Sequence, residues 1–285
     1  MSVIHMTIMQ IKRQLVSTRI VMFALLLIFV KGFVTDPLIK AVEEVAAAGG
    51  DYGISFLQPF ICLNNSFMLS LLMPLFFLVL VAGLPSAERF DLFVHIRTNR
   101  RRFILSQVLT VASLALCLLM LMLVTSGLMV MGHVDGSMQY CGAVTRYGIF
   151  FPDRTGEYVT TLIPPNLYNQ ESFGMAFVHS AVLLFLEFLL TGMVLLFFSV
   201  INLKFVGIIT EVVLTALSAI LTNSGIALKW LLPTAHTTIW LHKDAILEKE
   251  VFPMYLSYLY FGVLIIIFMV LTFVFAGRYE CERRS

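Results

Sequence analysis

Two carboxylates, Glu187 and Glu211, stand inside long apolar runs of this 285-residue chain. A charge inside a bilayer is costly, so carboxylates at such positions are often functional. One interpretation is that the pair couples transport to protons or cations, or lines a polar intramembrane path for a translocated substrate. The other is that each carboxyl makes a hydrogen bond between helices, as the neutral acid. The residues alone leave both interpretations open.

The other reactive residue types form no catalytic or metal-binding motif. His236 and His242 are six residues apart with no third ligand spaced with them, so we expect no metal site. The chain has no CxxC, HExxH or P-loop sequence. We therefore expect no catalytic residues, no enzyme activity and no cofactor bound by this chain itself. The four cysteines match no zinc or redox spacing: Cys62, Cys117, Cys141 and Cys281.

The composition predicts a membrane protein. Hydrophobic residues make up 59% of the chain and charged residues only 13%, whereas soluble domains carry about 25% charged residues. The net charge of +2 gives no reason to expect nucleic-acid binding. We predict an all-α polytopic protein, with residues 1–285 forming a single transmembrane domain.

Six apolar stretches are candidates for transmembrane helices, since a bilayer core requires about 20 apolar residues. The first is the weakest, because its uninterrupted run is only Ile20–Val30 and spans the bilayer only if Arg19 and Lys31 snorkel. A cleaved signal peptide is the competing interpretation, but its small-residue site at Ala46–Ala48 is too distant from the run. The predicted spans cover residues 17–37, 60–84, 103–131, 175–201, 205–221 and 254–276.

The distribution of basic residues predicts the orientation. With the N-terminus inside, the short inner segments hold twelve Lys and Arg residues and the longer outer segments hold six. This asymmetry follows the positive-inside rule with both termini in the cytoplasm. The predicted location is a plasma membrane, and the general character of the sequence favours a bacterial one.

Two segments outside the spans have recognisable patterns. Ile4, Ile8, Ile11 and Leu15 repeat at helical spacing and precede basic residues, which favours an N-terminal interfacial helix over a simple extension of the first span. The outer loop 132–172 is rich in Pro, Thr and aromatic residues, which is typical of a small ordered cap.

Cys62 and Cys141 both fall on the predicted outer side of the membrane. A disulfide between them is possible on an oxidising face. The alternative is that both thiols stay unpaired, and the spacing alone does not decide between the two states.

The inner loop between the second and third spans has two parts. Pro85 ends the span and Ser86 is a suitable N-cap, so we predict a short amphipathic helix over residues 87–97. The second part lies at the membrane interface, where its charges fix the inner face and bind anionic lipid. It consists of Arg100, Arg101 and Arg102.

The order of these features resembles the ABC-2-type permease family over most of the chain. The shared features are the helix before the first span, the inner loop "LPSAERFDLFVHIRTNRRRFILSQ", the short "NLK" turn, and a semi-polar outer segment before the last span. The resemblance implies the membrane subunit of an ATP-driven exporter of a hydrophobic or amphipathic substrate. A cytoplasmic ABC ATPase would bind ATP and Mg²⁺, and a second permease subunit, identical or related, would complete the pathway.

The resemblance also implies that the loop helix is a coupling helix that docks on the ATPase. Movement of that helix would convert the spans between inward- and outward-facing states. The residues that would dock are Glu88, Arg89, Phe90, Asp91, Phe93, Val94 and Arg97.

Two other classes of function are alternatives. One is a secondary transporter or channel that uses Glu187 and Glu211, although the chain has no visible internal repeat. The other is a membrane protein without transport activity, such as an immunity, sensor or assembly factor.

Overall fold

The computed structural model describes residues 2–16, 20–50, 52–85, 99–222, 224, 226–244, 246 and 249–276. Within these residues every regular element is helical, and only isolated bridges pair extended residues, at Ile54–Val134 and Lys243–Glu250. The all-α class is therefore confirmed. The elements are α1 Val3–Val16, α2 Ile20–Val30, η1 Lys31–Thr35, α3 Asp36–Ala47, α4 Gln58–Asn65, α5 Phe67–Val81, α7 Arg100–Met129, η2 Met131–His133, α8 Gly142–Thr145, α9 Tyr147–Phe150, η3 Pro152–Arg154, α10 Tyr158–Thr161, α11 Pro165–Tyr168, α12 Phe173–Val200, α13 Lys204–Thr222, η4 Ala227–Leu231, α14 Pro233–Thr237, η5 Ile239–His242 and α15 Met254–Phe275.

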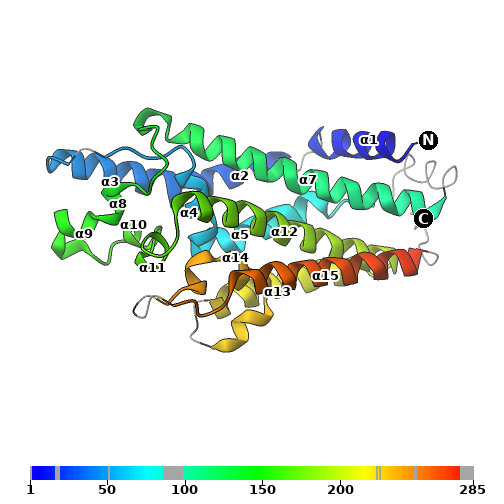
Figure 1. Ribbon diagram of the computed structural model, residues 1–285. Coiled ribbons are helices and arrows are strands. Elements are labelled where there is room, and N and C mark those ends of the chain that lie inside the picture. The colour runs from blue at the N-terminus through cyan, green and yellow to red at the C-terminus, as the bar shows by residue number, and fades with distance from the viewer. Residues whose placement is uncertain are drawn as a thin grey trace.

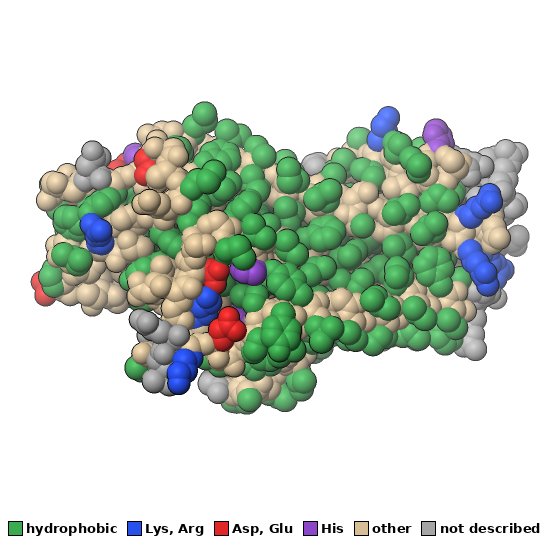
Figure 2. Space-filling view, viewed as in Figure 1, with side chains coloured by type: hydrophobic (Ala, Val, Ile, Leu, Met, Phe, Trp, Pro, Cys, Tyr) green, Lys and Arg blue, Asp and Glu red, His purple; other side chains and the backbone are tan. Residues whose placement is uncertain are grey.

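The long helices run side by side in an elongated bundle (Figure 1). α1 and α7 begin, and α15 ends, at one end, which we call the basic end because Arg100–Arg102 lie there. The short helices α8–α11 gather at the opposite, capped end. Hydrophobic side chains cover most of the middle of the visible face (Figure 2). An apolar band between two polar ends is the surface that a bilayer requires.

Five helices among the described residues are long and apolar enough to cross a membrane, which makes the chain a membrane protein. Four of them, α7, α12, α13 and α15, begin and end within three residues of the predicted ranges. The fifth, Val21–Ala47, runs through the π-helical turn η1 and is longer than expected. It continues ten residues beyond the predicted end at residue 37.

The predicted span 60–84 is not one straight helix. α4 and α5 meet at an angle of 91° and count as a sixth span only if the bent pair is taken together. Ser66 lies at the break in an extended conformation, with ψ 121°, and its amide still bonds to the carbonyl of Cys62. All eight residues of α4 are buried, so this bent segment is enclosed by protein.

The helix ends have local causes. The Asn99 side chain accepts a hydrogen bond from the amide of Arg101 and begins α7, and Ser172 likewise caps α12 through Met175. Asn202 turns the chain between α12 and α13 at φ 61°, a left-handed conformation that asparagine tolerates better than most residues.

α1 packs on the bundle through its more polar side. It lies alongside the first turns of α7, and the hydroxyl of Thr110 donates to Gln10 Oε1 at 2.7 Å. Thr7 and Gln14 are also buried on this side of α1, whereas Ile4 and Ile8 point outward. The helix is therefore inverted, with its polar face packed inside the bundle and its apolar stripe outside. Hydrogen bonding to α7 is the physical reason, since polar groups find no partner in lipid.

The core of the bundle is apolar and aromatic. Phe77 of α5 stacks on Phe188 of α12 with ring centroids 4.9 Å apart. Gly192 on α12 lets that helix approach α7 so closely that a Cβ atom there would clash with the Val111 side chain. Small residues at such crossings are typical of helix packing in membranes.

Gly192→Ala is expected to destabilise the bundle by about 1–3 kcal/mol, because the added methyl forces α12 and α7 apart. Gly262→Ala on α15 is the matched control, since a Cβ atom there has no neighbour within 4 Å. The control is expected to be neutral or to stabilise the helix by about 0.5–1 kcal/mol. Thermal unfolding of the purified variants in lipid nanodiscs measures both. Equal midpoints for the two variants would contradict the close α12–α7 contact.

Candidate functional site

The two carboxylates that the sequence singles out lie together inside the bundle. Glu187 of α12 is 2% exposed and Glu211 of α13 is 6% exposed. They are close enough to interact electrostatically. Two buried carboxyl groups from neighbouring helices form a polar site in an otherwise apolar region, which we call the carboxylate pair.

Hydroxyl groups surround the carboxylate pair. Thr234 of α14 donates to Glu187 Oε1 at 3.3 Å, and its amide donates to Ser218 Oγ on α13 at 2.9 Å. Thr191 of α12 lies within hydrogen-bonding range of Glu211. α14 thus packs against both α12 and α13. The hydroxyls stabilise the carboxyl groups, and neither carboxyl takes part in the Lys and Arg ion pairs found among the described residues.

Next to the pair lies a cluster of aromatic rings and imidazoles. His236 Nε2 contacts the Trp230 carbonyl oxygen at 2.8 Å and Nδ1 contacts Ser257 Oγ at 2.8 Å. Because a carbonyl oxygen only accepts, Nε2 carries the proton and the Ser257 hydroxyl donates to Nδ1. His236 also stacks on Tyr260 of α15, with centroids 4.1 Å apart.

His242 lies between two backbone carbonyl oxygens, which only accept, so its neutral ring donates to one of them. Its Nδ1 lies 2.9 Å from the carbonyl oxygen of Phe252 and its Nε2 lies 3.2 Å from that of His236. With both nitrogens of both rings engaged by protein groups, neither histidine offers a free nitrogen to a metal. Within the described part of the chain, no three His, Cys, Asp or Glu residues gather as a metal site.

A buried ion pair fixes the same segment to the cap. Lys243 pairs with Glu171, and the two side chains are only 11% and 13% exposed. Lys243 Nζ also donates to the carbonyl of Gln170 at 2.9 Å, and Asn166 Nδ2 donates to the carbonyl of Trp240 at 2.6 Å. The chain between α13 and α15 is therefore held at the capped end by α11 and the start of α12.

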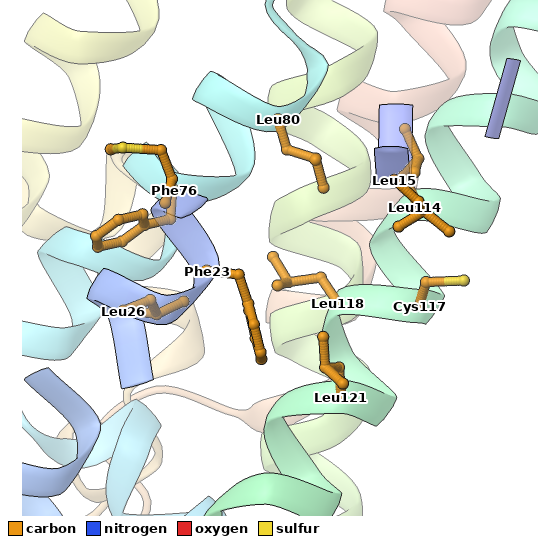
Figure 3. A pocket seen from close by; sticks show the side chains of 10 residues that line it. Leu15, Phe23, Leu26, Phe76, Leu80, Leu114, Cys117, Leu118 and Leu121 are labelled. Atoms are coloured by element: carbon orange, nitrogen blue, oxygen red, sulfur yellow. The ribbon is translucent and has the colours of Figure 1, made fainter. Parts of the chain in front are cut away.

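An apolar space lies between α2, α5 and α7 near the start of α2 (Figure 3). Phe23 of α2 and Leu118 of α7 point into it, and Phe76 of α5 lies at its edge. Its volume is only about 50 Å³, far below the several hundred Å³ of typical ligand pockets. It has no polar group with which to orient a ligand and carries no chemistry.

The predicted docking residues Glu88, Arg89, Phe90, Asp91, Phe93, Val94 and Arg97 all lie outside the described residues. Arg100, Arg101 and Arg102 are exposed in the first turn of α7, where their positive charges surround the basic end. This position agrees with an interfacial role but does not test it.

Cys62 and Cys141 are neighbours at the capped end, and both are buried. The Cys141 amide donates to Gln58 Oε1, one helical turn before Cys62. The structure holds both as free thiols, so the possible disulfide is not formed in it. Burial raises the pKa of the Cys141 thiol, which keeps it protonated and weakly reactive.

The spacing of residue types in the sequence did not predict the hydroxyls that lie around the carboxylate pair. Thr191 and Ser218 are single polar residues inside apolar helices, and nothing in their spacing links them to Glu187. Only Thr234 could have been singled out, because it follows Pro233 in a semi-polar segment that is too short to span a membrane.

No protein-family model, no curated protein and no solved structure matches this chain.

The stability of the segment around α14 is expected to fall with acidification. Burial lowers the pKa of His236 to about 4, whereas an unfolded histidine titrates near 6.5. The unfolded chain therefore binds this proton first as the pH falls. The contribution of neutral His236 to the free energy of unfolding is fully present above about pH 6.5. It is lost as the pH falls towards about pH 4, a change of up to about 3 kcal/mol.

Thermal unfolding between pH 7 and pH 4 measures this change. His236→Gln keeps one donor and one acceptor but does not titrate, so its midpoint should depend less on pH than that of the unchanged protein. His242, which lies against the His236 carbonyl, titrates in both proteins. Parallel pH curves for the two proteins would contradict the assignment to His236.

Proposed function

We propose that the chain is the membrane subunit of an ATP-driven, ABC-type exporter, with ATP hydrolysed by a separate cytoplasmic subunit. The sequence resemblance to ABC-2-type permeases motivates the proposal. The observation that carries it is the anchoring of the two helices that flank the predicted coupling segment, residues 87–97. α5 ends just before this segment and α7 begins just after it.

Both flanks of the segment are fixed to the bundle. On one side, Lys204 Nζ at the start of α13 donates to the Pro85 carbonyl oxygen at 3.3 Å. On the other, Asn99 caps α7, which packs against α1 and α12. A force applied to the segment by an ATPase would therefore act on α5, α7 and α13 together. Such rigid transmission is what a coupling helix requires.

The proposed setting is a plasma membrane, with both termini and the basic end in the cytoplasm. Arg100–Arg102 would then face anionic headgroups. Apolar side chains of α15 such as Leu259 and Val274 are well exposed and would contact lipid or a second permease subunit. The apolar surface fits a hydrophobic or amphipathic substrate.

The proposal predicts that charge reversal in the segment breaks the complex with the ATPase. Glu88→Lys, Arg89→Glu and Asp91→Lys, combined in one variant, should abolish co-purification with the P-loop ATPase of the proposed complex. The cause would be like-charge repulsion at a complementary interface. Asp153→Lys at the capped end is the matched control and should retain the partner.

Membrane insertion of each variant is followed in parallel, since a misfolded chain would also lose the partner. Undiminished binding by the correctly inserted triple variant would remove the coupling-segment proposal.

A second candidate function has one observation in its favour: Glu187 and Glu211 are buried side by side among hydroxyls. We infer from this that a secondary transporter or channel could use the pair to carry a proton or cation. Glu187→Gln should then abolish gradient-driven uptake or efflux in proteoliposomes while the helical content stays unchanged. Thr125→Val on α7, far from the pair in the chain, should transport normally. Full transport by Glu187→Gln would leave the pair with a structural role.

A further inference from the structure

A chamber of about 580 Å³ lies between the bend of α4 and α5, the cap helices α10 and α11, and η5. Its volume is within the range of about 300–1,000 Å³ that is typical of ligand pockets. Glu187 and Glu211 do not line it. It is a separate feature, and nothing in the sequence patterns pointed to it.

The chemistry of the lining selects the kind of ligand. No side chain that lines the chamber carries a formal charge. A charged ligand would find no counter-ion there. The hydroxyls of Ser66, Tyr158 and Thr161 already have protein partners but can accept further hydrogen bonds, so a neutral ligand with hydrogen-bonding groups suits the lining better than a hydrocarbon. The lining side chains used here are Asn64, Asn65, Ser66, Tyr158, Thr161 and Trp240.

Two of these side chains have an unused hydrogen-bonding atom. Asn65 is 6% exposed; its Nδ2 donates to the Ile61 carbonyl, but its Oδ1 has no partner. Trp240 Nε1 is buried and has no acceptor. Such groups are rare in folded proteins because each costs free energy. Each atom is enclosed by protein although its side chain lines the chamber, so a ligand hydroxyl, which both donates and accepts, would reach it only after that side chain turns.

Hydrogen bonds hold the chamber wall in place before any ligand arrives. The hydroxyls of Ser66 and Tyr158 are 3.1 Å apart, and the Tyr158 hydroxyl donates to the Phe33 carbonyl. Asn64 Nδ2 donates to the Ser180 carbonyl at 2.8 Å. These bonds join α4, α5, α10, η1 and α12, so little ordering remains to oppose binding.

We propose that this chamber binds a neutral polyhydroxyl group, that is, a sugar or the sugar headgroup of a glycolipid. The amides and hydroxyls supply directional hydrogen bonds, and the Trp240 and Tyr158 rings offer apolar faces to the C–H faces of a sugar ring. Binding requires neither an ATPase nor the carboxylate pair, so the proposal stands apart from the proposed transport function.

The two tryptophans of the chain make the test direct, because Trp240 lines the chamber and Trp230 does not. Trp230→Phe keeps an aromatic ring against Phe252 and leaves Trp240 as the sole indole reporter. This protein is placed in phosphatidylcholine nanodiscs and titrated with maltose. A second preparation contains diglucosyl diacylglycerol in the nanodisc. Choline chloride is the charged comparison probe.

A saturable change in Trp240 emission with maltose assigns the chamber to free sugars. A change only with the glycolipid assigns it to a lipid headgroup. Either result supports the proposal. No saturable change with either sugar, or an equal change with choline, overturns it.

Variants of the wall test the contacts against a matched control. Thr161 and Thr125 both donate to a carbonyl of their own helix, but only Thr161 lines the chamber. In the Trp230→Phe background, Thr161→Val and Asn65→Ala should each weaken binding about fivefold, the effect of one hydrogen bond. Thr125→Val should bind normally. Circular dichroism confirms that each variant is folded, and equal affinities for all three folded variants overturn the proposal.

Discussion

A lipid interior offers no hydrogen-bond partner, and this constraint determines which side chains of the chain face inward. On α1 it inverts the usual arrangement, with Gln10 bonded to Thr110 inside and Ile4 exposed outside. At Glu187 it gathers hydroxyls from a neighbouring helix and an inserted segment. At the bend before α5 it encloses all of α4. Polar side chains therefore determine how the apolar helices are placed.

The fold was predictable where an apolar run is long and has clear ends. α12 and α15 are examples, because Ser172 and Pro253 mark their starts and each helix is long and apolar enough to cross a membrane. The bend at Ser66 was not predictable. Residues 60–84 read as one apolar run, and the 91° turn depends on contacts of α4 with α7 and α12. The packing of α1 on α7 was not predictable either, since the sequence pattern shows that a helix has an apolar face but not which helix lies beside it.

The carboxylates of the candidate site could be found because a charge in an apolar run is conspicuous. Their proximity could not, since it follows from the tight Asn202 turn, which folds α13 back along α12. The hydroxyl partners and the outer chamber combine residues from distant parts of the chain. Asn65, Tyr158 and Trp240 are unremarkable singly, and only tertiary packing makes them one wall.

One short segment connects the interior of the bundle with the outer chamber. Thr234 bonds to Glu187, whereas Thr238 and Trp240, a few residues later, line the chamber. The Lys243–Glu171 ion pair and Asn166 fix the far end of the segment to the cap. α14 and η5 are one residue apart in the chain and contact each other, so the carboxylate pair and the chamber are built on one structural element.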